Sequence, residues 1–226
     1  MDKTVNKVAI AVEITSDVVC PWCWIGKKRL DLAIERLKDE FTFNVTWKPF
    51  LLQLIHNVPE RGIPLKDYLW QKYGKGYAED IFSANSSVNR SAAEVGIVFS
   101  SSRLMVPTKK AHMLLNHASK HGKQHELLEA IFQAYHCCAR NINDDSVLIE
   151  IAGSVGLDPA GARGALHSPE ALQDFDRAWT QSQDISGVPR FDVYLQDKPS
   201  GSHLVFSGSQ SVDTFVTVFR RLRVSS

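Results

Sequence analysis

The stretch SDVVCPWC at residues 16–23 stands where one pattern of apolar residues gives way to another. Before it, β-branched apolar residues alternate with smaller or polar residues over 8–15, which predicts a strand. After it, the apolar residues of 24–37 fall on one helical face. Pro21 suits the first turn of a helix, because the amide hydrogen that proline lacks has no partner there. Two cysteines, separated by Pro-Trp, are therefore expected at a strand-to-helix junction.

This position predicts thiol–disulfide chemistry. A thiolate attacks disulfides, whereas a thiol hardly does. The free N–H groups and the positive end of the dipole at a helix N-terminus favour an anion, although Asp17 nearby opposes it. We expect Cys20 to attack as the thiolate. Cys23, one turn further, is expected to be the more buried sulfur and to close a disulfide with Cys20.

Two other interpretations of the cysteine pair are a zinc half-site and a pair without function. Zinc takes four ligands in tetrahedral geometry, and the only other cysteines, Cys137 and Cys138, are adjacent, which is poor spacing for a second pair. We expect them to be packed or half-exposed residues at a helix end. The strand-to-helix context favours redox chemistry over both alternatives.

Three histidines recur at metal-like spacing, namely His117, His121 and His125. Gly122 predicts a break in the helix that would align them, so we expect a solvated face rather than a metal site. No metal is expected elsewhere in the chain.

The rest of the chain predicts an α/β fold of the thioredoxin type, interrupted by an all-helical insertion. A second strand at 43–47 completes the start of a βαβ unit. Helical spacing punctuated by glycines then continues to 167, which is too long for a loop. A helix from 168, strands at 191–195 and 204–207, and a closing helix from 212 follow. We expect residues 1–58 and 168–226 to form the thioredoxin-like domain and 59–167 the insertion.

Pro189 is expected to complete the site. In thioredoxin folds a cis proline lies beside the active disulfide, and its backbone offers a strand-like edge to the substrate. Cis bonds are nearly confined to X–Pro, and Val188-Pro189 directly precedes the third predicted strand; the alternative is an ordinary trans proline that opens a strand. We expect Val188, Pro189 and Arg190 to bind substrate together with Pro21 and Trp22. Arg190 would pair with a carboxylate such as that of glutathione, or be a plain exposed strand residue.

The chain also resembles the FrnE-like branch of the DsbA oxidoreductase family over nearly its whole length. The motifs that carry the resemblance are CPWC with Ile25-Gly26-Lys27, then Ala111-His112, Asn141-Ile142 with Asp144, Gly156-Leu157-Asp158, Gly187-Val188-Pro189 and Ser207-Gly208-Ser209-Gln210. The resemblance implies a thioredoxin fold with a helical insertion, and active-site roles for Cys20, Cys23 and Pro189. His112 matches a family position and is a further candidate. Pro107 and Arg190 depart from the family pattern, which affects the expected substrate preference.

Two other functions remain open. Kappa-class glutathione transferases and 2-hydroxychromene-2-carboxylate isomerases resemble this architecture but typically carry serine at the position of Cys20, so retention of both cysteines favours disulfide exchange. A non-enzymatic chaperone or binding module would instead use the helical insertion. No obligatory cofactor is expected. The expected partners are proteins bearing thiols or disulfides, or small thiols such as glutathione, which would act as redox partner or co-substrate.

The composition of the chain limits the expected partners and cellular location. The 226 residues carry a formal net charge of +1 without a block of like charge, so neither nucleic acid nor an anionic membrane is an expected partner. No apolar run approaches the ~18 residues of a membrane span, and the first residues lack the apolar stretch of a secretory signal. Four cysteines are too few for a disulfide-stapled secreted scaffold. We expect a cytoplasmic protein; its oligomeric state is not predicted.

Overall fold

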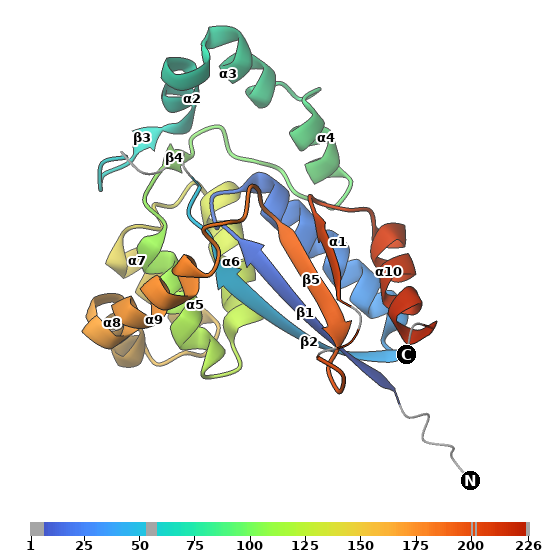
Figure 1. Ribbon diagram of the computed structural model, residues 1–226. Coiled ribbons are helices and arrows are strands. Elements are labelled where there is room, and N and C mark those ends of the chain that lie inside the picture. Colours follow the sequence, from blue (N-terminus) through green and yellow to red (C-terminus); the bar gives the residue numbers. More distant parts are fainter. Residues whose placement is uncertain (1–6, 53–57, 200, 202, 225–226) are drawn as a thin grey trace.

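The computed structural model describes residues 7–52, 58–199, 201 and 203–224 (Figure 1). The expectation about a secretory signal concerns residues that lie partly outside these ranges. Ten helices and six strands occur in the part described, in the order β1 (Val8–Ser16), α1 (Pro21–Leu37), β2 (Phe41–Pro49), β3 (Ile63–Pro64), α2 (Leu65–Tyr73), α3 (Lys75–Phe82), α4 (Ser87–Ala93), β4 (Leu104–Met105), α5 (Lys109–Ser119), α6 (Gln124–His136), α7 (Asp145–Ser154), α8 (Pro159–His167), α9 (Pro169–Thr180), β5 (Arg190–Leu195), β6 (Leu204–Ser207) and α10 (Val212–Val224). None of these helices is both long and apolar enough to cross a membrane.

A four-stranded sheet in the order β2-β1-β5-β6 forms the centre. β1 pairs in parallel with β2 and antiparallel with β5, and β5 pairs antiparallel with β6. β1 is the most buried strand, with Ile10, Val12 and Ile14 fully inaccessible, because it lies between two neighbours and is covered by helices. The loop after β1 therefore leaves from the middle of the sheet, where α1 begins.

Helices cover the sheet in two groups. α1 and α10 pack side by side, and α10 also contacts β5. α5, α6 and α9 contact β2, the edge strand at the other side of the sheet. In Figure 1 the segment from α2 to α4 arches over the end of the sheet from which α1 starts. The predicted thioredoxin-like fold with a helical insertion is confirmed.

The insertion differs from its prediction in two ways. It is not entirely helical, because β3 and β4 form a short antiparallel pair in which Ile63 lies opposite Met105. It also contains α3, which was not expected, since Gly74 with φ 89° ends α2 and α3 starts directly after it. α9, assigned to the thioredoxin-like domain, contacts both α5 of the insertion and β2 of the sheet, so the boundary at residue 168 stays a prediction.

Candidate active site

Cys20 occupies the N-cap position of α1. Its backbone is extended (φ −80°, ψ 113°), and its N–H donates to the carbonyl oxygen of Asp17 at 3.1 Å. Pro21 is the first residue of the helix, as expected. The first turn contains no acidic residue, so no carboxylate of the helix itself offsets the positive end of the dipole. The sulfur of Cys20 therefore lies at the positive end of the α1 dipole.

Cys23 lies deeper than Cys20. Its side chain is fully buried, whereas 5% of Cys20 is accessible, and both cysteines are free. Burial, together with hydrogen bonding to Cys20 and the charge of Cys20, raises the pKa of the Cys23 thiol well above its usual value. Cys23 thus stays protonated near neutral pH, as a thiol that reacts second should. The predicted order of burial is confirmed.

The loop before β5 reaches the sulfur of Cys20. The Val188–Pro189 peptide bond is cis, as predicted. The Sγ of Cys20 lies 3.9 Å from the carbonyl oxygen of Val188. Gly26 permits this approach, because a Cβ added there would stand 3.2 Å from the Cγ of Pro189. A glycine on α1 therefore lets the proline loop lie directly against the helix that carries both cysteines.

A cavity of about 340 Å³ opens beside Cys20. Its walls include Pro21, Trp22 and Val188, so the structure brings these three predicted residues together with Cys20. The other walls include residues of α2, α3 and α4, of the loop before β4 and of β4 itself. Most of these residues are apolar: Leu65, Leu69, Ile81, Val88, Phe99 and Met105. The cavity also contains one strong cation, Arg103.

Arg190 lies elsewhere. It is the first residue of β5, its Nε is 3.3 Å from the Oδ2 of Asp192, and it lines a different cavity with Glu13 and Lys48. The structure does not bring its side chain into the cavity of Cys20. Pro189 contributes through its contact with α1 at Gly26 rather than as a wall of that cavity.

A buried polar cluster lies behind the two cysteines. The carboxylate of Asp17 is fully buried; its Oδ2 accepts the N–H of Leu52 at 2.8 Å, and its Oδ1 stands 3.5 Å from the Nε2 of His112. These facing atoms, and the hydroxyls of Ser16 and Thr108, have no hydrogen-bond partner in the structure. The polar side chain of Ser16 and the backbone of Asp17 lie close to Cys23 and lower its pKa against the effect of burial. The cluster connects Cys23 to an acid and an imidazole.

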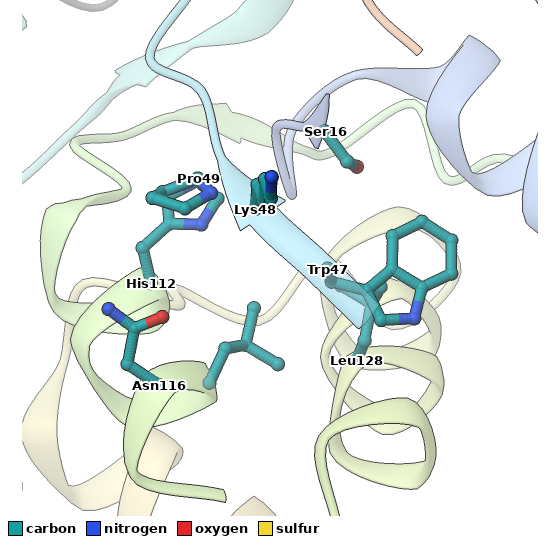
Figure 2. Close-up of a pocket in the computed structure, with 8 residues that line it drawn as sticks. Ser16, Trp47, Lys48, Pro49, His112, Asn116 and Leu128 are labelled. Carbon is teal, nitrogen blue, oxygen red and sulfur yellow. The ribbon is translucent and has the colours of Figure 1, made fainter. Parts of the chain in front are cut away.

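Figure 2 shows a small cavity at the edge of this cluster. His112 rises from α5 toward the ends of β1 and β2, with Asn116 one turn further along the helix. The cavity has a volume of about 10 Å³, close to the room that one water molecule needs. Ser16 and His112 therefore line the same small cavity.

Sequence reasoning missed two of these residues. Asp17 was considered only for its effect on Cys20, although an acidic residue inside the run SDVV beside a predicted active cysteine is itself a signal. Arg103 gave no signal, because nothing in the sequence around it distinguishes a buried arginine from an exposed one. His112 was singled out by resemblance alone, and the structure places it 3.5 Å from Asp17.

The discounted histidines and cysteines are spread over several elements. α5 ends at Ser119 and Gly122 has φ 66°, so the predicted break is confirmed. His125 is not on a solvated face: its Nε2 lies 3.0 Å from Asp31, and its Nδ1 accepts from the indole of Trp47. In the ranges described, no three or more acidic, histidine or cysteine side chains are grouped as a metal site would require.

Cys137 and Cys138 follow α6. Cys137 is its half-buried C-cap residue and Cys138 is exposed. Burial raises the pKa of the Cys137 thiol. Both cysteines are free, and neither lines the cavity beside Cys20. The expectation of a packed or half-exposed residue at a helix end is confirmed for Cys137 and is wrong for Cys138, which is exposed.

Comparison with known proteins gives a family. The family model described as DSBA-like thioredoxin domain matches residues 11–220. YwbO of Bacillus subtilis (strain 168) is 28% identical over 194 residues, which cover 82% of this chain and 88% of YwbO. A probable DsbA oxidoreductase, SCO1869 from Streptomyces coelicolor, has a solved structure that is similar with a TM-score of 0.80 and 26% identity, over 96% of this chain and 91% of that one.

A more distant structure shares the fold alone. It is described as the cytosolic disulfide reductase DsbM from Pseudomonas aeruginosa with GSH, and is similar with a TM-score of 0.60 and 17% identity. The match covers 94% of this chain and 99% of that one. The match to the family model, at residues 11–220, includes the junction of β1 and α1 and the helical insertion.

Proposed function

The chain belongs to the family of DSBA-like thioredoxin domains, and from that premise we propose that it is a thiol–disulfide oxidoreductase in which Cys20 attacks and Cys23 resolves. The observation that carries the proposal is the contrast between the two sulfurs. Cys20 stands at the start of α1, 3.9 Å from the Val188 carbonyl oxygen and beside a cavity, and Cys23 is fully buried behind it. The assignment to the FrnE-like branch stays a prediction.

The exchange takes two steps. The Cys20 thiolate attacks one sulfur of a substrate disulfide; a bond to that sulfur forms, the substrate S–S bond breaks, and the first substrate thiolate leaves. Cys23 then loses its proton and attacks the Sγ of Cys20, which expels the second substrate thiolate. The substrate is reduced by two electrons and Cys20 and Cys23 become a disulfide. Run in reverse, the same steps oxidise a substrate dithiol.

The second step needs a proton acceptor, because burial holds Cys23 in its protonated form. We assign this role to the pair formed by Asp17 and His112, whose facing atoms are 3.5 Å apart and lack other partners. Ser16, whose polar side chain lies close to Cys23, is suited to pass the proton toward them. Carboxylate and imidazole side chains held within reach of a reacting group are common proton acceptors in proteins.

The expected substrates are proteins or small molecules with thiols or disulfides, and glutathione is a candidate partner. Support comes from the fold shared with DsbM, whose structure was described with GSH. The cytoplasm is the proposed location, since a reducing compartment suits a free CPWC pair. A glutathione-dependent isomerase or transferase would have no use for Cys23, and a non-enzymatic chaperone or binding module would have no use for either cysteine.

Reduction of insulin or of glutathione disulfide, measured with a regenerating reductant, tests the proposal. Cys20→Ser should abolish turnover, and Cys23→Ser should stop after one mixed disulfide. A variant in which Cys137 and Cys138 are both serine is the control and should retain activity, because neither residue lines the cavity. Full activity of the Cys20→Ser protein would rule the mechanism out, and full activity of Cys23→Ser would favour the isomerase class.

A further inference from the structure

Arg103 is a buried cation whose contacts within the described ranges are with neutral groups. Just 6% of it is accessible. Its Nε donates to the carbonyl oxygen of Ser100 at 2.8 Å, one Nη donates to the Nδ1 of His136 at 3.2 Å, and the guanidinium lies over the Phe99 ring at 4.7 Å from its centre. Burial and the charge of Arg103 lower the pKa of His136 well below its usual value, so the imidazole is neutral. These contacts fix the guanidinium in place but leave its charge uncompensated.

No aspartate or glutamate in the described ranges lies within ion-pair distance of Arg103. Residues 53–57 carry no acidic side chain in the sequence. Buried charges in proteins are ordinarily paired, because taking an unpaired ion out of water is strongly unfavourable. A guanidinium kept in this state beside a cavity is a site for an anion from outside the chain.

The walls of the cavity indicate which other chemical groups the anion carries. Arg103 and Cys20 line the same space of about 340 Å³, within the range of small-molecule sites. The side chains around them are those of Leu65, Leu69, Phe99 and Met105, with Trp22 near the cysteine. Such walls favour an apolar or aromatic body and disfavour a strongly polar one. A planar fork of N–H donors pairs best with a carboxylate.

We infer that this cavity binds small disulfides, or the corresponding thiols, in which an apolar body carries a carboxylate. Arg103 holds the carboxylate while Cys20 attacks the sulfur. This substrate class rests on the function proposed above and makes it more specific. The exchange itself is unchanged: the Cys20–sulfur bond forms, the substrate S–S bond breaks, the carboxylate-bearing thiolate leaves or stays in the mixed disulfide, and Cys23 completes the two-electron reduction.

Two aromatic disulfides form a matched pair of probes. Dithiobis-nitrobenzoate carries carboxylates on its rings, and dithiodipyridine carries none. The rate at which the fully reduced protein releases the coloured thiol from each is measured by stopped flow, for the unchanged protein and for Arg103→Met. We expect Arg103→Met to lose about 10- to 100-fold in rate toward the carboxylate probe, the effect of one charge-assisted hydrogen-bonded pair, and little toward the neutral probe. Arg103→Lys, which keeps the charge without the fork, should fall between.

Arg61→Met is the matched control, since Arg61 is exposed and its removal changes the net charge equally. It should leave the ratio of the two rates unchanged. An equal loss toward both probes in Arg103→Met, or none toward either, would overturn the inference. An equal fall in Arg61→Met would assign the effect to net charge and overturn it too. If Cys20 of the unchanged protein reacts with neither probe, it is the proposed function that fails.

Discussion

The molecule contains two buried cations that differ in how their charges are balanced. Lys27, on the second turn of α1, is 2% accessible and lies 2.8 Å from the carboxylate of Asp31 and 2.9 Å from that of Glu129 on α6. Arg103, beside the cavity, is 6% accessible and has neutral partners only. The first cation joins α1 to α6, and its charge is balanced within the chain. The second is balanced by nothing in the described ranges, so the two should respond to mutation in different ways.

Polar groups without partners and paired polar groups are also separated along α1. At its N-terminus the hydroxyl of Ser16, the Oδ1 of Asp17 and the Nε2 of His112 have no hydrogen-bond partner among the described residues. One to three turns later the charges are paired: Glu129 also accepts from Lys28 and from the indole of Trp24, and Asp31 contacts His125. Unpaired polar atoms collect where the chemistry is proposed, and paired ones where the helices are joined. Buried polarity alone therefore does not mark a site, whereas buried polarity without partners does.

The largest effect on stability should come from Lys27→Met. It leaves two carboxylates without their shared cation and should lower the free energy of unfolding by about 3–5 kcal/mol. Arg103→Met should lower it by less than half as much, because the change also removes an unpaired buried charge. Urea unfolding of both variants measures the difference. A loss of equal size in Arg103→Met would show that Arg103 is structural and would remove the contrast.

The next effect in size concerns the unpartnered atoms near the cysteines. Asp17→Asn, and separately His112→Asn, should slow the attack of Cys23 on the mixed disulfide by about 100-fold, the usual contribution of a positioned proton acceptor. The rate of the first thiol release should change little. The pH profile of the second step should also move in the variants, which a merely structural role would not produce.

The matched control for this prediction is Glu13→Gln. Glu13 is a carboxylate on β1, the strand that ends just before Asp17, and it pairs with Lys48 and Tyr194 instead of facing His112. The Glu13→Gln variant should leave the rates of both steps unchanged. Unaltered resolution in Asp17→Asn and His112→Asn would refute the assignment of the proton acceptor.

A smaller effect is expected from acid. Burial by itself raises the pKa of Asp31 and of Glu129, but the contacts of Asp31 with His125 and Lys27, and of Glu129 with Lys27 and Lys28, outweigh it and lower both pKa values. Carboxyls with pKa values lower in the folded state stabilise the fold above about pH 4, and that contribution is lost as pH falls through the folded values. Unfolding measured from about pH 6 to 2 should therefore show a decline, and Lys27→Met a flatter one. Equal slopes in the two proteins would contradict the pairing.

Most of the fold was predictable from periodicity. β1, α1 and the α5 to α8 region are amphipathic or uniformly apolar, and their bounds differ from the prediction by about one or two residues at most ends. α3 was missed because Gly74 and Gly76 flank or interrupt its start and its pattern is short. β3 and β4 were missed because two residues per strand leave no period to detect.

The site was predictable only where a local motif or a turn specified it. One local motif contains Cys20, Pro21, Trp22 and Cys23. The cis proline was predictable from an X–Pro pair that directly precedes a strand. Arg103 could not be predicted in this way, because its role as a candidate ligand-binding residue depends on its contacts with Ser100 and His136. It also depends on cavity walls that come from α2 to α4. Arg190 was chosen for its neighbour in sequence, but successive residues on a strand point to opposite faces, and its side chain lines another cavity.

We propose that Cys20 is the first to react with the substrate sulfur and that Cys23 reacts second. The most direct test is a protein in which Cys23, Cys137 and Cys138 are all serine, incubated with glutathione disulfide and analysed by peptide mass spectrometry. We expect one stable glutathione adduct, on the peptide that contains Cys20. Absence of that adduct, while the companion protein with Cys20 as serine and Cys23 intact becomes modified instead, would contradict it.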